Sequence, residues 1–169
     1  RARGRSWRRH PCIMRTAAQR DKMGTVAGDL PAIEAKAYFH VVNYCLSKDM
    51  AVKEKFKTLG DFHEYAKGSK KAPCLTVFVG GNHEASNVLQ SLYYGGWVAP
   101  NIYFLGFAGV INICGVRIAG CSGIFKPQHF SLGHYEEPPY NESDKRSVYH
   151  TRELEVYRLH QLQRPVDIM

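Results

Sequence analysis

A run of six β-prone, mostly apolar residues from Cys74 to Val79 constrains the fold of this chain more than any other segment. The run follows Pro73 and ends at Gly80-Gly81. A short apolar run bounded in this way is typical of a strand that is buried on both faces, as in an α/β sheet. We therefore expect an α/β domain around this strand, in a chain whose 169 residues suffice for one ordinary domain.

The flanking sequence predicts further helices and strands around this strand. Helical spacing of apolar residues is found over 33–46, within the Lys-rich stretch 48–71, over 85–92 and over 147–162. Strands are expected over 102–105, in a hairpin of 110–113 and 116–119, and from Val166 onward. The segment 122–144 is expected to form a long irregular loop, and loops of this length are usually functional.

The positive charge is concentrated at the start of the chain. The net charge is +8, and residues 1–22 hold eight basic residues and one acidic residue, so this segment carries +7 of it. We interpret residues 1–23 as a basic segment that is disordered or foreign to the domain, and residues 24–169 as a partial domain truncated at its C-terminal end. The basic composition therefore predicts little about the folded part.

Cysteine content and hydropathy exclude two classes of protein. The five cysteines are scattered without a C-x-x-C pair, which fits neither a disulfide framework nor a zinc knuckle and indicates a reducing compartment. No stretch approaches the roughly 20 apolar residues of a membrane helix, and no secretory signal is visible.

The segment that carries chemistry is Gly80-Gly81-Asn82-His83-Glu84, directly after the predicted buried strand. Turns at the carboxyl ends of strands in open α/β sheets place side chains where ligands bind. Asn82 offers a carbonyl oxygen suited to a divalent metal, and His83 offers an imidazole that can donate a proton. The alternative is a Gly-Asn turn with a surface histidine.

A strand followed by Gly-Asn-His-Glu resembles the third signature of the calcineurin-like metallophosphoesterases. The wider sequence resembles one family among them, the RNA lariat debranching enzymes, from about residue 48 to residue 168. The segments that carry this resemblance are Lys70-Lys71-Ala72-Pro73, Gly80 to Asn87, Tyr94 to Asn101, Ser122 to Lys126 and Pro138 to Asn141.

The resemblance implies an incomplete metallophosphoesterase-type sheet flanked by helices, and a nuclear enzyme of intron turnover. Its activity would be metal-dependent hydrolysis of the 2′,5′-phosphodiester in branched intron lariat RNA. His83 would be the catalytic histidine over the phosphate, and Asn82 would be a metal ligand. The metal would be iron, zinc or manganese, which the sequence does not distinguish.

The long loop corresponds by resemblance to a lariat-recognition loop of roughly residues 122–152. Its candidate substrate-binding residues are Ser122, Gly123, Phe125, Lys126 and Tyr140. A lysine can bind phosphate, and aromatic rings can stack on unpaired bases. The alternative for Phe125 and Tyr140 is that they attach the loop to the core.

The chain also departs from the family pattern. Residues 1–23 contain no Cys- or Asp-x-His motif. Gly28-Asp29 lacks a preceding apolar strand and fits a helix cap better, and Gly60-Asp61 lies inside the Lys-rich amphipathic stretch. Asn82 is thus one ligand of a site that needs several, and we expect the chain alone to be inactive. A non-catalytic RNA-binding or structural role, and a metallophosphoesterase with another phosphodiester substrate, are the alternatives.

The remaining candidates have simpler interpretations. The histidines at 129, 134, 150 and 160 show no ligand spacing and are expected on the surface or on helix faces. Cys121 is expected to be a small buried residue rather than a nucleophile. Trp97, between glycines and Pro100, is expected to anchor a turn by packing.

Overall fold

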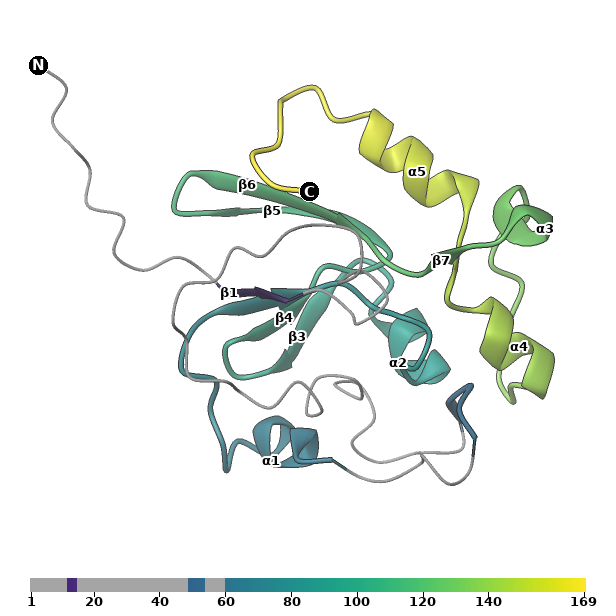
Figure 1. The fold of residues 1–169 in the computed structure, drawn as a ribbon, viewed down its shortest axis with the longest axis horizontal. Helices are drawn as coiled ribbons and strands as arrows, with labels where there is room; N and C mark the ends of the chain where they lie inside the picture. The colour runs from purple at the N-terminus through teal and green to yellow at the C-terminus, as the bar shows by residue number, and fades with distance from the viewer. Residues whose placement is uncertain (1–11, 15–48, 54–59) are drawn as a thin grey trace, which may run out of the picture.

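The computed structural model describes residues 12–14, 49–53 and 60–169 (Figure 1). In chain order the elements are β1 (Cys12–Met14), α1 (Phe62–Ala66), β2 (Thr76–Phe78), α2 (Ser86–Ser91), β3 (Gly96–Ala99), β4 (Ile102–Phe104), β5 (Ala108–Ile113), β6 (Val116–Cys121), β7 (Ile124–Phe125), α3 (Pro127–Phe130), α4 (Glu142–Ser147), β8 (His150–Thr151) and α5 (Glu153–His160). The architecture is α/β, as expected, with small open sheets and flanking helices.

The predicted buried strand lies inside the main sheet. This four-stranded sheet has the order β1-β2-β4-β3, in which β2 is parallel to β1 and β4, and β3 is antiparallel to β4. All three residues of β2 are buried, because helices cover one face of the sheet and a hairpin covers the other. The strands predicted over 74–79 and 102–105 are therefore both confirmed, as β2 and β4.

Two apolar clusters fix the layers on either side of this sheet. Phe62 of α1 and Leu89 of α2 pack with Phe78 and Phe104 on one face. On the other face Val77 packs with Ile118 of the hairpin β5–β6, and the residues that surround this pair are also apolar. Figure 1 shows the hairpin on one side of the sheet and α1 and α2 on the other. The predicted hairpin is confirmed, with its turn at Cys114-Gly115.

The predicted helix over 147–162 is wrong in its first part. Ser147 ends α4, the backbone then extends into β8, and the next helix begins only at Glu153. Helix α4 begins at an Asn141 cap whose side chain accepts hydrogen bonds from the backbone of Ser143 and Asp144. β8 is extended because it pairs with β7, a long-range contact that helical spacing does not reveal.

Three further differences concern strands. The sequence did not predict β1 within the basic opening segment, where Cys12–Met14 pairs with β2 in parallel. It also missed β3, which we interpreted as a turn. The strand expected from Val166 is reduced to a single parallel bridge between Ile168 and Ile118 of β6.

Some predictions fall outside the described residues. These are the helix over 33–46, the part of the Lys-rich stretch at 54–59 and most of the opening segment. Among the helices that the structure describes, none has the length and apolar character to cross a membrane.

Candidate functional site

The segment Gly80–Glu84 follows β2 at the carboxyl end of the strand and leads into α2. Gly80 is buried, and a Cβ at this position would come within 3.0 Å of Leu89 and 3.4 Å of Phe104. These distances are tighter than ordinary packing, so a glycine lets the chain leave the strand close against α2. The sequence therefore places the turn where ligands bind in open α/β sheets.

The two candidate residues of this turn differ in exposure. His83 is exposed and Asn82 is half-buried, and neither makes a side-chain hydrogen bond with another described residue. The imidazole of His83 is therefore available to a ligand and has no packing role in the core. Its assignment to catalysis stays a prediction, as does the assignment of Asn82 to a metal.

Sequence reasoning gave no role to the residues that follow. Glu84 and Ser86 are buried, with exposed fractions of 4% and 0%. A glutamate two residues after the predicted metal ligand gives no signal of burial, because glutamate is mostly exposed in proteins. The segment that follows the turn is therefore buried, in contrast to His83.

The donor atoms in the described residues do not by themselves fit a divalent metal. No group of three or more His, Cys, Asp or Glu side chains gathers in the part of the chain that the structure describes. One amide oxygen from Asn82 falls short of the ligand number that such ions require. We therefore derive no catalytic step through a metal from these residues.

The long loop begins directly against this turn. The backbone N–H of Gly80 donates to Ser122 Oγ (2.9 Å), and that hydroxyl donates to the carbonyl of Gly106 (2.5 Å). The N–H of Gly123 donates to the carbonyl of Gly80 (2.9 Å). Ser122, which is 3% exposed, thus fixes the start of the loop beside the turn that carries His83. Its predicted contact with RNA stays a prediction.

Gly123 is placed by its backbone conformation. Its φ is +93°, and a Cβ would come within 2.2 Å of the Tyr149 carbonyl oxygen. Only glycine satisfies both conditions, so this residue sets the direction of the loop rather than presenting a side chain to a ligand.

Phe125 and Lys126 lie on the surface. Phe125 in β7 is 61% exposed and packs edge to face with the ring of Phe130, at 5.3 Å between centroids. Lys126 precedes α3 and is also exposed. An exposed aromatic ring beside an exposed cation suits contact with unpaired bases and phosphates. The alternative that Phe125 attaches the loop to the core has no support in this exposure.

Tyr140 occupies a more internal position. Its hydroxyl donates to Gln90 Oε1 (2.5 Å), and Gln90 Nε2 donates to the carbonyl of Glu136 (2.9 Å). Gln90 belongs to α2, the helix that follows the Gly-Asn-His-Glu turn. Tyr140 therefore attaches the loop to the domain, which was the alternative left open by the sequence.

A buried ionic cluster attaches the C-terminal part of the loop to the domain. Arg152 is 1% exposed, and its Nη2 lies 2.5 Å from Glu136 Oε1, which also accepts from the Ser147 hydroxyl. The same guanidinium donates to the carbonyls of His129 and Ser147. Burial alone would raise the pKa of Glu136, but the neighbouring His134, Ser147 and Arg152 side chains bring it to about 2. The carboxylate is therefore charged and paired.

His134 links this cluster to α5. Its Nε2 lies 3.1 Å from Glu155 Oε1 and its Nδ1 lies 3.4 Å from Glu136 Oε2. Burial would lower the pKa of His134, but the two carboxylates raise it above the usual range. Tyr93 also donates to Glu155, and burial together with that contact raises the pKa of Tyr93 to about 12. The expectation that His134 is a surface or helix-face histidine is wrong, because its ring lies between the buried carboxylates of Glu136, two residues later, and Glu155, which is distant in sequence.

A second pair of loop histidines faces each other. Nδ1 of His150 in β8 lies 2.9 Å from Nδ1 of His129 in α3. One of the two rings must carry its proton on Nδ1, because a hydrogen bond needs a donor and an acceptor. Burial first, and then the neighbouring His129, Arg152 and Lys126, lower the pKa of His150 to about 4. Both rings are only half-buried, which agrees with the surface position expected for them.

Cys121 and Trp97 have different outcomes. Cys121 is half-buried, and burial raises the pKa of its thiol, so it is not a reactive thiolate, as expected. Trp97 lies on β3 rather than in a turn and is 61% exposed, but its ring packs edge to face on Tyr103, so the predicted packing role is met only in part.

The fold and this turn define a part of a metallophosphoesterase-type α/β domain, with a long loop attached beside the strand-to-helix turn. No family model matches the chain. The chain is 60% identical over 119 residues to the lariat debranching enzyme of Homo sapiens and 61% identical over 119 residues to that of Drosophila melanogaster, which in both cases is 70% of the chain and 22% of the relative. It is 50% identical over 143 residues to the lariat debranching enzyme of Schizosaccharomyces pombe, which is 85% of the chain and 29% of the relative.

The matched part of the chain belongs to the lariat debranching enzyme family. The chain spans between a fifth and a third of the length of these relatives.

Proposed function

We propose that this chain supplies the central part of an enzyme that hydrolyses the 2′,5′-phosphodiester of branched RNA, such as an excised intron lariat. The observation that carries the proposal is the 60% identity over 119 residues to a protein named lariat debranching enzyme. The attachment of the long loop to the Gly-Asn-His-Glu turn supports it, because binding and cleaving a branched substrate requires both to be held in one geometry.

His83 is proposed to act at the scissile phosphate. Its imidazole is exposed on the turn after β2, where it can hold a proton near a substrate oxygen and donate it to the leaving group. Phe125 and Lys126 are proposed to contact the RNA from the loop, and Ser122, Gly123 and Tyr140 to position that loop. Asn82 is proposed as one ligand of a divalent metal, which would supply charge stabilisation, with the other ligands outside the described residues. We propose a nuclear location, where excised introns arise.

A chimeric enzyme tests the proposed function. In this chimera the matched part of this chain replaces the corresponding segment of the Homo sapiens relative, and cleavage of a branched RNA is measured with a linear RNA of equal length as the control. We expect the chimera to release the branch and to leave the linear RNA intact. A folded chimera that does not cleave the branch would contradict the proposal.

A second role applies to the chain by itself. Since its described residues contain no cluster of metal-ligating side chains, we propose that the 169-residue chain alone binds RNA without cleaving it. Cleavage of branched RNA by the isolated chain with added manganese would contradict this role, and metal analysis of the same sample would show the cause.

A further inference from the structure

A second candidate binding surface, which combines an aromatic ring with a lysine, lies at the end of the sheet opposite the turn that carries His83. It is an open pocket of about 480 Å³ lined by Lys71, Trp97, Val98, Ala99, Pro100 and Asn101. The turn between β3 and β4 and the segment before β2 form it, so it lies at the amino ends of β2 and β4. The turn that carries His83 lies at the opposite ends of these strands.

Trp97 is exposed but held in place. Its indole is 61% exposed on β3 and packs edge to face against Tyr103 of β4, with 5.1 Å between ring centroids and 78° between planes. The two residues are paired across the strands. A large ring that is both fixed and open to solvent can stack on a flat ligand without losing much conformational freedom.

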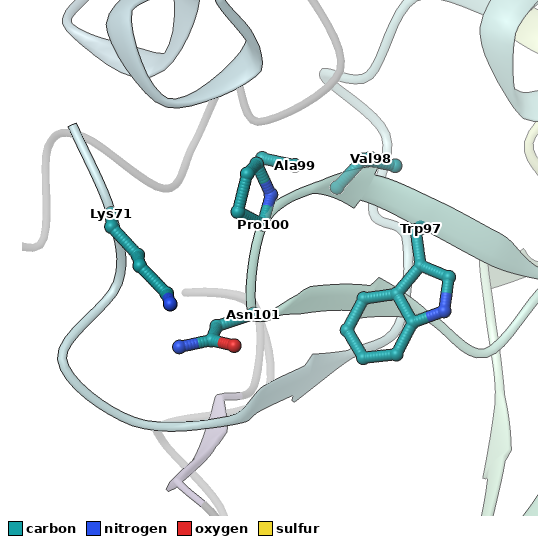
Figure 2. A pocket seen from close by; sticks show the side chains of 6 residues that line it. All are labelled: Lys71, Trp97, Val98, Ala99, Pro100 and Asn101. Atoms are coloured by element: carbon teal, nitrogen blue, oxygen red, sulfur yellow. The ribbon is translucent and has the colours of Figure 1, made fainter. Parts of the chain in front are cut away.

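Lys71 brings a positive charge to the same pocket. Figure 2 shows its side chain extending toward Asn101, with the indole of Trp97 beyond that residue. The six lining residues include no acid. The neighbouring Lys70 is paired with Asp61 and Glu64, whereas no carboxylate of the described residues lies at ion-pair distance from Lys71. The pocket therefore favours an anion.

The floor of the pocket is rigid. Asn101 has a φ of +63°, which asparagine tolerates better than most residues, and its side chain donates to the carbonyl of Ala72 (3.0 Å). The N–H of Thr76 donates to the carbonyl of Asn101 (2.8 Å). These bonds hold the backbone that carries Lys71 against the turn that follows Trp97, so the lysine side chain starts from a fixed position beside the ring.

From this geometry we propose that Trp97 and Lys71 form a binding site for single-stranded RNA, in which a base stacks on the indole and a phosphate binds the ammonium group. A flat aromatic group joined to an anion is the ligand that matches an indole packed on Tyr103 beside a lysine that has no carboxylate partner in the described part of the chain. The inference rests on the proposed function, since it assigns this site to a linear segment of the RNA that the His83 side would cleave.

Fluorescence of Trp97 itself tests the site. The chain holds two tryptophans, so the Trp7→Phe variant leaves Trp97 as the sole emitter. A short linear oligouridylate is titrated at physiological salt into this variant, and into the same variant shortened to begin at Pro11, which lacks five of the eight arginines and lysines of residues 1–22 but keeps β1. We expect saturable quenching in both. Absence of quenching in the shortened chain would overturn the proposal.

Matched substitutions separate stacking from charge. By anisotropy of the labelled oligonucleotide on the shortened chain, Trp97→Ala should weaken binding about tenfold and Trp97→Phe much less, because a phenyl ring still stacks. Lys71→Ala should weaken binding and reduce the salt slope by about one, whereas Lys67→Ala, an exposed lysine outside the pocket, should change neither. Equal affinities for Trp97→Ala and the parent would overturn the proposal.

The chimeric enzyme distinguishes this inference from the proposed function. Trp97→Ala in the chimera should raise KM for branched RNA with long linear arms and leave kcat unchanged, because the indole lies away from the turn with His83. Debranching without any effect of Trp97→Ala would overturn the inference alone. Binding of linear RNA at Trp97 in a chimera that does not debranch would overturn the proposed function alone.

Discussion

The hydroxyl oxygen of Ser122 lies 2.9 Å from the backbone nitrogen of Gly80, 42 residues earlier in the chain, and accepts its hydrogen bond. The same hydroxyl donates to the carbonyl of Gly106. This buried contact joins the residue that opens the long loop to the residue that opens the Gly-Asn-His-Glu turn.

Replacing Ser122 tests the value of this contact. Ser122→Ala leaves the buried N–H of Gly80 and carbonyl of Gly106 without this partner, and we expect the free energy of unfolding to fall by about 1–3 kcal/mol. Urea denaturation of the 169-residue chain gives the value. Ser131→Ala, at an exposed loop position, is the control and should leave the midpoint unchanged. Equal midpoints for the two variants would show that water replaces the lost hydroxyl.

Replacing Arg152, the buried cation, should lower the free energy of unfolding more than Ser122→Ala does. Arg152→Met leaves the buried carboxylate of Glu136 without its guanidinium partner, with His134 Nδ1 still 3.4 Å away, and we expect a loss of about 3–5 kcal/mol. Adding Glu136→Gln to this variant should recover part of the loss, because the buried side chain that lost the guanidinium is then neutral. Arg146→Met on the exposed side of α4 is the control. A double variant less stable than Arg152→Met would contradict this account.

His134 and His150, whose pKa values are shifted in opposite directions, should change the free energy of unfolding in opposite pH ranges. The pKa of His134 is raised above its ordinary 6.5, so its contribution is complete below pH 6.5 and is lost as the pH rises through the native value. The pKa of His150 is lowered to about 4, so its contribution is complete above pH 6.5 and is lost as the pH falls toward 4.

Urea midpoints measured from about pH 4 to about pH 9 check both signs. His134→Gln should flatten the decrease of stability above pH 6.5, and His150→Gln should flatten the decrease below it. The same effect of both variants in one pH range would show that at least one of the two directions is wrong.

Lys126→Ala should weaken RNA binding without affecting the fold. In the chimeric enzyme we expect lower affinity for branched RNA and a salt slope smaller by about one, since one phosphate contact is lost. The melting temperature should stay constant, because an exposed cation contributes little to stability. A lower melting temperature with unchanged affinity would make Lys126 a structural residue.

His83→Ala and Asn82→Ala should separate proton transfer from metal binding. In the chimeric enzyme we expect His83→Ala to lower turnover by about two to four powers of ten while the metal content stays constant. Asn82→Ala should lower metal content and turnover together. Loss of metal in the His83→Ala chimera would instead identify His83 as a ligand.

The parts of the fold that depend on local pattern were predictable. The apolar run around β2, the hairpin β5–β6 and the short helix α2 are each specified by neighbouring residues, and the structure contains all three. β1 and β3 were missed because a strand of three or four residues shows too little alternation, and pairing with β2 or β4 decides its conformation.

In the candidate site too, features set by neighbouring residues were predictable and features set by long-range contacts were not. The position of His83 on an exposed turn followed from the strand and the glycines before it. The contacts of His134 with Glu155 and of Tyr140 with Gln90 did not, because they join residues that only the tertiary fold brings together. Two local signals could have separated α4 from α5: the capping pair Asn141 and Asp144 at the start of α4, and Glu155, which accepts from the backbone N–H of Arg152 at the start of α5.

The pairing of β7 with β8 means that the loop leaves the domain and returns to it at the same point. The ends of the segment between Phe125 and His150 are therefore fixed by the sheet pairing, and its interior is fixed at Tyr140 and Glu136 by their contacts with Gln90 and Arg152. Extra residues are cheapest at its exposed positions, such as 131–133, because each doubling of a flexible loop adds only about 0.6 kcal/mol of closure entropy. The segment can thus change in length at those positions while the turn that carries His83 stays unchanged.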